Sequence, residues 1–146
     1  MAKLRHLSLH TADPEKTAEF YKRVFDMKEV GRTDSPIAKG VYLSDGTINM
    51  AILHFAWDQG LGLDFRGIHH FGVLVDDVDA YTQKLEALGA ECFAKRPEKA
   101  KGFFETKFHG PDKVTFDITD HPWKGSAGLD APAAKEERVP EKLGAA

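Results

Sequence analysis

A repeated strand–helix unit is the feature that most limits the folds open to this chain. Residues 4–25 (LRHLSLHTADPEKTAEFYKRVF) align without gaps on residues 68–89 (IHHFGVLVDDVDAYTQKLEALG), at a constant shift of 64 positions (70 − 6). Under this shift His6 falls on His70, and most of the apolar positions coincide. The chain is therefore expected to contain two equivalent structural units.

Each repeated segment reads as a strand followed directly by a helix. Asp13 and Asp77 are suited to cap the two helices, and Pro14 fits a first helical position, where its missing N–H costs nothing. Gly89 is suited to a left-handed helix end. Helical spacing predicts that the apolar faces consist of Ala18, Tyr21, Val24 and Phe25 in the first helix, and Val78, Tyr81, Leu85 and Leu88 in the second.

Strand pairs follow each helix. Asp-Gly separates two β-type runs in VYLSDGTINMAILHF, and Gly-Pro-Asp separates two more in FFETKFHGPDKVTFDIT. Each half therefore reads as a strand, a helix and about three further strands. This pattern predicts an α+β fold of two βαβββ modules, at about 3–56 and 67–122, with a linker at 57–66 inside a single domain at 1–124. Residues 125–146 have almost no large apolar side chain and are expected to form a mobile tail.

Composition excludes several classes of function. The net charge of −3 gives no electrostatic reason to expect nucleic acid as a partner. No apolar run approaches the roughly 20 residues that span a bilayer, so no membrane partner is expected either. The single cysteine, Cys92, excludes an intramolecular disulfide and a zinc site built from cysteines. A cytoplasmic location is expected.

Strand alternation predicts a polar face that carries candidate metal ligands. In the first strand His6, Ser8 and His10 share the face that points away from the helix, and His70 occupies the equivalent face of the later strand. By the same alternation His69 is expected on the opposite face and is not expected to bind a metal. The run KVTFDIT adds Asp117 to the polar face. Two imidazoles and a carboxylate suit a divalent metal with open positions; an ordinary polar strand face is the alternative.

These stretches, together with GPDKVTFDIT, resemble the vicinal oxygen chelate superfamily. That superfamily includes glyoxalase I, type I extradiol dioxygenases, methylmalonyl-CoA epimerase, and the fosfomycin and bleomycin resistance proteins. The resemblance extends over about residues 3–121. It implies that the curved mixed sheets of two βαβββ modules form a metal-binding cleft, with His6, His70 and Asp117 as the ligands.

The chain departs from the family at two ligand positions. The family usually has glutamate at the last position, where this chain has the shorter Asp117. Counting five residues beyond Asp45, as Asp117 lies five beyond Asp112, leads to Met50 in the first half. A thioether is a poor ligand for hard divalent metals. Three protein ligands are therefore expected, and glyoxalase I activity itself is disfavoured.

The resemblance implies a metal-dependent enzyme of glyoxalase or dioxygenase type, acting as a lyase, isomerase or dioxygenase. One divalent ion (Fe²⁺, Mn²⁺, Ni²⁺ or Zn²⁺) would bind a small substrate through two adjacent oxygens and stabilise an enolate or catecholate. His10 is the first candidate for a proton shuttle, and Glu105 and His54 are weaker ones. An apolar wall is expected from Tyr42, Phe55, Phe104 and Trp57.

A second function stays open at this point. The chain could instead be a metal-free protein that binds a small molecule or drug, as the bleomycin resistance proteins do. The aspartate at position 117 and Met50 favour this alternative, whereas the two histidines and the acid favour the enzyme. The family precedent also suggests a homodimer.

Overall fold

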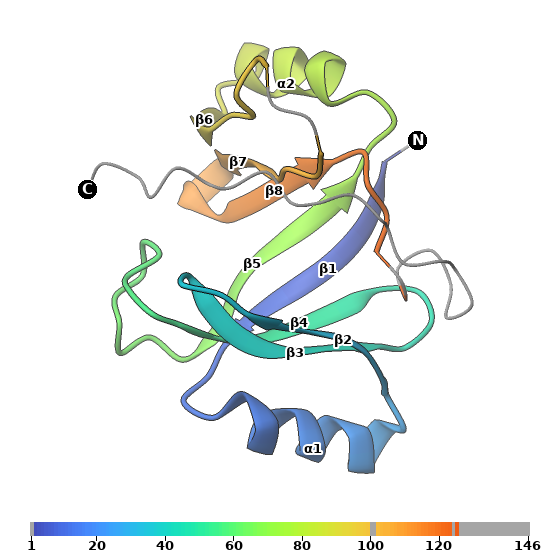
Figure 1. Cartoon of the computed structure of the whole chain (residues 1–146). Coiled ribbons are helices and arrows are strands. Elements are labelled where there is room, and N and C mark those ends of the chain that lie inside the picture. Colours follow the sequence, from blue (N-terminus) through green and yellow to red (C-terminus); the bar gives the residue numbers. More distant parts are fainter. Residues whose placement is uncertain (1, 100–101, 124, 126–146) are drawn as a thin grey trace.

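The computed structural model describes residues 2–99, 102–123 and 125, and it has two βαβββ modules (Figure 1). The predicted fold class and the order of elements are confirmed. The first module consists of β1 (Lys3–His10), α1 (Pro14–Phe25), β2 (Lys28–Asp34), β3 (Ala38–Ser44) and β4 (Asn49–Phe55). The second consists of β5 (Gly67–Leu74), α2 (Val78–Ala87), β6 (Glu91–Ala94), β7 (Thr106–His109) and β8 (Thr115–Thr119), with a short 3-10 helix at Pro111–Lys113.

All eight strands form one mixed sheet in the order β2-β3-β4-β1-β5-β8-β7-β6. β1 is parallel to β4, β5 is parallel to β8, and β1 and β5 run antiparallel to each other. Leu7 pairs with Phe71, its own counterpart in the repeat, so an approximate twofold axis passes between them. In Figure 1, β1 and β5 cross the middle of the molecule and the two helices lie at opposite ends. Equivalent residues of the two modules therefore meet at the β1–β5 seam.

The local signals at the helix ends act as predicted. Asp13 Oδ1 accepts a hydrogen bond from the Lys16 amide (3.1 Å), and Asp77 Oδ1 accepts one from the Ala80 amide (2.9 Å). Gly89 follows α2 with a φ of 89°, in the left-handed region that favours glycine. The caps start both helices directly after the strands that carry the candidate histidines.

The predicted helix faces are only partly correct. Ala18 is buried, and Tyr21 packs with it against Leu9 and Val41 under the sheet. Val24, Phe25 and Leu88 are exposed by 55%, 65% and 88%. These three lie at or just beyond the C-terminal end of a helix, whereas Val78, Tyr81 and Leu85 of α2 pack against the buried core of the second module as predicted. No described helix is long and apolar enough to cross a membrane.

The C-terminal segment expected to be mobile lies outside the described residues, except for Gly125. The carbonyl of Gly125 accepts a hydrogen bond from Ser44 Oγ (2.9 Å). This contact places the start of the segment at the end of β3.

Candidate metal centre

His6, Gly72 and Asp117 form one row across three neighbouring strands. Gly72 on β5 pairs with His6 on β1 and with Asp117 on β8. A Cβ atom on Gly72 would lie 2.2 Å from the His6 ring and 2.7 Å from Asp117 Oδ1. The missing side chain therefore leaves the room in which the two flanking side chains approach each other. His70, two residues earlier on β5, lies beside them.

Three donor atoms converge in this row. His6 Nε2 lies 3.2 Å from His70 Nε2, and Asp117 Oδ2 lies 3.5 Å from His6 Nε2 and 3.4 Å from His70 Nε2. Nitrogen and oxygen ligands held at about 2.0–2.2 Å from one ion stand roughly 2.8–3.6 Å apart in octahedral or tetrahedral geometry. Two imidazoles and one carboxylate are also the donor set of non-haem iron sites. The spacing and the donor chemistry fit a divalent metal, and the role of the three residues as ligands stays a prediction.

Burial favours the neutral form of the two histidines of β5. Desolvation, and then the neighbouring His6, lower the pKa of His70 well below its usual value. Desolvation also lowers the pKa of His69. A neutral imidazole keeps a nitrogen lone pair, which metal binding requires. The environment of the β5 histidines therefore favours the state that binds metal.

The alternation of side chains is broken once in β1 and once in β5. The register of the β1–β5 ladder skips Arg5 on one strand and His69 on the other, and these are equivalent positions of the repeat (69 − 5 = 64). A bulge leaves an extra residue unpaired and re-aims a side chain. Arg5 reaches Asp117, and His69 lines the same cavity as His70. The prediction that His69 points to the face opposite His70 is therefore wrong.

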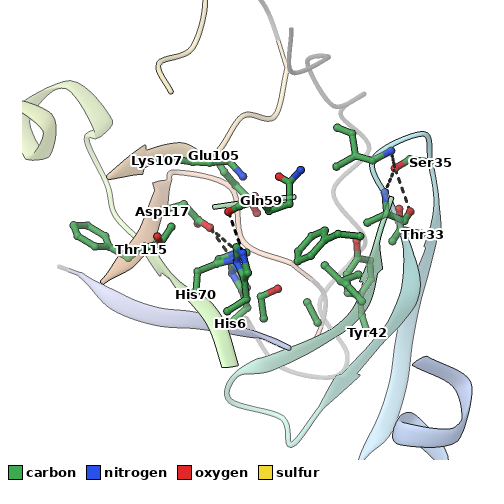
Figure 2. A pocket seen from close by; sticks show the side chains of 18 of the residues that line it. His6, Thr33, Ser35, Tyr42, Gln59, His70, Glu105, Lys107, Thr115 and Asp117 are labelled. Carbon is green, nitrogen blue, oxygen red and sulfur yellow. Dashed lines mark hydrogen bonds and ion pairs between the residues drawn. The ribbon is translucent and has the colours of Figure 1, made fainter. Parts of the chain in front are cut away.

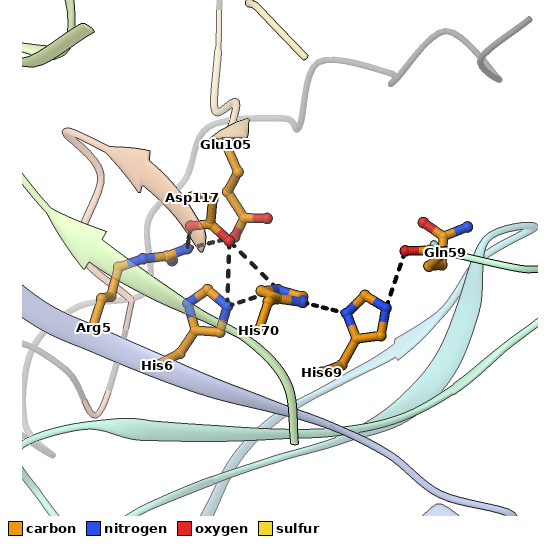
Figure 3. A network of polar contacts seen from close by, with 7 residues as sticks. All are labelled: Arg5, His6, Gln59, His69, His70, Glu105 and Asp117. Carbon is orange, nitrogen blue, oxygen red and sulfur yellow. Dashed lines mark hydrogen bonds and ion pairs between the residues drawn. The ribbon is translucent and has the colours of Figure 1, made fainter. Parts of the chain in front are cut away.

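Arg5 forms a buried network beside the candidate ligands (Figure 3). Its Nη2 donates to Glu105 Oε1 and lies 3.6 Å from Asp117 Oδ1. The guanidinium stacks on Trp123, 4.0 Å from the ring centroid. One cation thus joins two buried carboxylates. Arg5 was not among the sequence-predicted site residues, although a charged residue inside an apolar strand, one position before a candidate ligand, was a visible signal.

A cavity of about 430 Å³ opens over the candidate ligands. In Figure 2, Thr33 and Ser35 lie at the far side of this cavity from His6, His70 and Asp117. Cavities of this size bind small organic molecules. Most of the remaining wall is apolar and includes Ile37, Ala38, Tyr42, Leu53, Phe55, Phe93, Phe116 and Trp123.

The predicted aromatic wall is half correct. Tyr42 and Phe55 line the cavity, whereas Phe104 and Trp57 are absent from the described residues that line it. Trp123 also lines the cavity and packs on the His6 ring in a tilted arrangement, with a centroid distance of 5.2 Å. Its position after the last strand gave no sign of this role in the sequence.

Ser8 offers a polar contact on the cavity surface. Its side chain is fully buried and lines the cavity, and its hydroxyl has no hydrogen-bond partner within the described part of the chain. A buried hydroxyl of this kind costs free energy unless something bonds to it. Ser8 is therefore a candidate contact for a bound molecule.

The structure brings Glu105 to the cavity, but not His10 or His54. His10 is buried and does not occur among the described lining residues; its Nδ1 accepts from the Phe55 amide (3.3 Å). The Phe55 ring, which does line the cavity, packs on His10 at a centroid distance of 5.0 Å. His10 thus lies at the end of β1, behind the Phe55 ring, and its role in proton transfer stays a prediction. Glu105 is the candidate for proton transfer that lines the cavity itself.

The counterpart of Asp117 in the first module is Ala51, not Met50. Asp117 pairs with Gly72, and Ala51 pairs with Ser8, which corresponds to Gly72 in the repeat. The count along the sequence fails because three residues separate Asp45 from β4, whereas two separate Asp112 from β8. A methyl group cannot bind a metal. The expectation of three protein ligands is unchanged. Ala51, at the position where a fourth ligand would stand, is part of the cavity wall.

A protein-family model matches residues 3–131 of the chain. The matching family model is described as "Glyoxalase/Bleomycin resistance protein/Dioxygenase superfamily". No curated protein sequence matches the chain.

Solved structures share this fold at low sequence identity. A hypothetical protein from Bacillus halodurans C-125 is 20% identical with a TM-score of 0.68, over 80% of this chain and 92% of that chain. A variant of the Streptomyces coelicolor methylmalonyl-CoA epimerase, in complex with 2-nitronate-propionyl-CoA, is 17% identical with a TM-score of 0.66, over 80% and 94%. The Mycobacterium tuberculosis methylmalonyl-CoA epimerase is 19% identical with a TM-score of 0.65, over 80% and 85%. Likeness at these identities shows the fold alone.

Proposed function

Because the chain belongs to the glyoxalase/bleomycin resistance protein/dioxygenase superfamily, we propose that it is a metal-dependent enzyme that binds a small substrate through two adjacent oxygens. The observation that carries the proposal is the convergence of His6 Nε2, His70 Nε2 and Asp117 Oδ2 within 4.8 Å of one another under the cavity. Three protein ligands would leave positions open on a bound divalent ion for a substrate with two oxygens. The reaction is of lyase, isomerase or dioxygenase type.

A bound divalent ion supplies Lewis acidity, which stabilises negative charge as it develops on the substrate oxygens. The chain supplies the remaining functions. His6, His70 and Asp117 would hold the ion, and Glu105 would accept a proton from the substrate inside the cavity. Ser8 donates a hydrogen bond to the substrate from the cavity wall.

The shape of the cavity defines what the substrate must carry. The substrate oxygens have to lie at one end, near the donor atoms. The body of the substrate has to pack against walls that are largely aromatic and aliphatic. Ala51 places a methyl group where a fourth ligand would stand and adds an apolar side chain to the cavity wall. Substrates with two adjacent oxygens on an apolar body match both ends of the cavity.

The second candidate function is a metal-free protein that binds a small molecule. The apolar lining of the cavity and Ala51 at the fourth ligand position favour this alternative. Such a protein needs the cavity but not the three donor atoms. Metal binding therefore separates the two functions.

Substituting Asp117 by asparagine is expected to weaken binding of a divalent metal by about tenfold or more. The change keeps the shape of the side chain but removes the anionic oxygen that hard divalent ions favour. Asp117→Glu keeps the carboxylate and is expected to retain the metal. Titration of Mn²⁺, Fe²⁺, Ni²⁺ and Zn²⁺ by isothermal calorimetry measures the affinities.

Asp112→Asn is the matched control, since Asp112 lies exposed in the turn before β8. Asparagine tolerates its left-handed backbone (φ 57°). This control should bind the metal as the wild type does. Equal affinities for wild type and Asp117→Asn would contradict the enzyme proposal and favour the metal-free binding protein.

A further inference from the structure

A chain of hydrogen bonds runs from the loop after β4 to His70 (Figure 3). The carbonyl oxygen of Gln59 lies 3.1 Å from His69 Nε2. On the other side of the same ring, His69 Nδ1 lies 2.8 Å from His70 Nδ1. Nε2 of His70 faces His6 and Asp117. His69 therefore stands between a fixed carbonyl and a candidate ligand.

The directions of these hydrogen bonds follow from the Gln59 carbonyl, which only accepts. His69 must therefore carry its proton on Nε2. In a neutral ring the other nitrogen is then an acceptor, and the ring is held in this orientation by packing on Phe55, with 5.0 Å between the ring centroids. His69 Nδ1 accepts from His70 Nδ1, so the proton of His70 lies on Nδ1. A neutral His70 is thereby left with a lone pair on Nε2.

We propose that His69 is a positioning residue that fixes the tautomer of His70, so that the lone pair of His70 Nε2 points at the metal position between His6 and Asp117. This inference rests on the proposed metal-binding function. Ligating histidines generally donate their other ring N–H to an acceptor, and loss of that acceptor typically weakens metal binding by about 10–100-fold. Here the acceptor is the adjacent histidine, because the bulge in β5 turns both side chains to one face.

The repeat supports this assignment. Arg5 occupies the bulge position of β1 and contacts Asp117, as His69 occupies the bulge position of β5 and contacts His70. In both modules the residue just before a candidate histidine ligand is turned into the site without joining the donor triad. Each of these two residues contacts a candidate ligand without being one itself.

Nuclear magnetic resonance of the metal-free protein tests the tautomers directly. The ¹⁵N shifts of the imidazole rings are expected to show a proton on Nδ1 of His70 and on Nε2 of His69. In His69→Phe, His70 is expected to lose its preference for the Nδ1 proton. A proton on Nε2 of His70 in the wild type would overturn the inference, whether or not the protein binds metal.

Metal affinity gives the second readout, with Mn²⁺ and Zn²⁺ as probes in calorimetry. His69→Phe keeps an aromatic ring of similar size but removes both nitrogens, and it is expected to weaken binding by about 10–100-fold. His69→Asn places an oxygen at the same number of bonds from Cα as Nδ1, so it should restore most of the affinity. His54→Phe is the matched control, because His54 is exposed and bonds to the Thr11 carbonyl outside the site; it should bind as the wild type does.

The outcomes distinguish this inference from the proposed function. If wild type binds metal and His69→Phe binds it equally well, the role of His69 is wrong and the metal site stands. If His69→Phe and His69→Asn lose affinity equally, the hydrogen bond to His70 is not the cause, and the inference fails. If no variant binds metal, the proposed function fails, and the imidazole shifts alone decide the tautomer assignment.

Discussion

Replacing Arg5 by methionine is expected to lower the free energy of unfolding by about 3–5 kcal/mol, which is typical of removing one partner from a buried ion pair. Arg5 is fully buried, and its guanidinium contacts the carboxylates of Glu105 and Asp117. Methionine fills similar volume beside Trp123 but leaves the two buried carboxylates without that cation. Urea unfolding of the metal-free protein, followed by circular dichroism, measures the change.

Two further variants test the cause. Arg5→Met combined with Glu105→Gln removes one of the two carboxylates as well, so the double variant should lose less stability than the sum of the single ones. Arg32→Met is the control: Arg32 also pairs with glutamates, Glu15 and Glu29, but on the surface. Surface ion pairs contribute little, so a loss as large as that of Arg5→Met would contradict the role given to burial.

Substituting Gly72 by alanine is expected to weaken metal binding by more than about a hundredfold, beyond the 10–100-fold effect of changes outside the ligand shell. The new Cβ atom would lie 2.2 Å from the His6 ring and 2.7 Å from Asp117 Oδ1, so at least one ligand must move. Both side chains are about 1% exposed, and the packed surroundings leave them little room to do so. Calorimetric titration with Zn²⁺ measures the loss, and thermal unfolding checks that the variant folds.

Ser8→Ala is the matched control for Gly72→Ala. Ser8 is the counterpart of Gly72 in the repeat and already carries a Cβ atom on the same face. Its substitution removes only a hydroxyl that lies outside the donor triad, and metal affinity should stay near that of the wild type. Metal binding by Gly72→Ala at wild-type strength would show that the row across β1, β5 and β8 does not hold the metal.

Much of the fold could be predicted because its signals are local and occur twice. The capping aspartates Asp13 and Asp77 and the turn residues between the strand pairs each specify a boundary by their own chemistry. The repeat then sets His6 beside His70, since two equivalent strands that meet at a twofold axis bring equivalent residues together.

The parts of the site that escaped prediction depend on strand pairing. Alternation assigns a face to each residue only while the ladder is regular, and the bulges at Arg5 and His69 break it. Met50 was confused with Ala51 because Asp45 lies one residue farther from the next strand than Asp112 does, which a count along the chain cannot detect without the register. Trp123 lies beyond the last strand, where no periodicity applies.

The seam between β1 and β5 also has a consequence for kinetics. Any ion held by the three candidate ligands would join residues far apart in the chain, since His6 and His70 are separated by 64 positions. Contacts between such distant residues are slow to form and stabilise the chain only late in folding. Interactions that are absent from the transition state slow unfolding and leave the folding rate nearly unchanged. A metal bound across this seam would therefore extend the lifetime of the folded protein without making it fold faster. A chelator would shorten the lifetime to that of the metal-free protein.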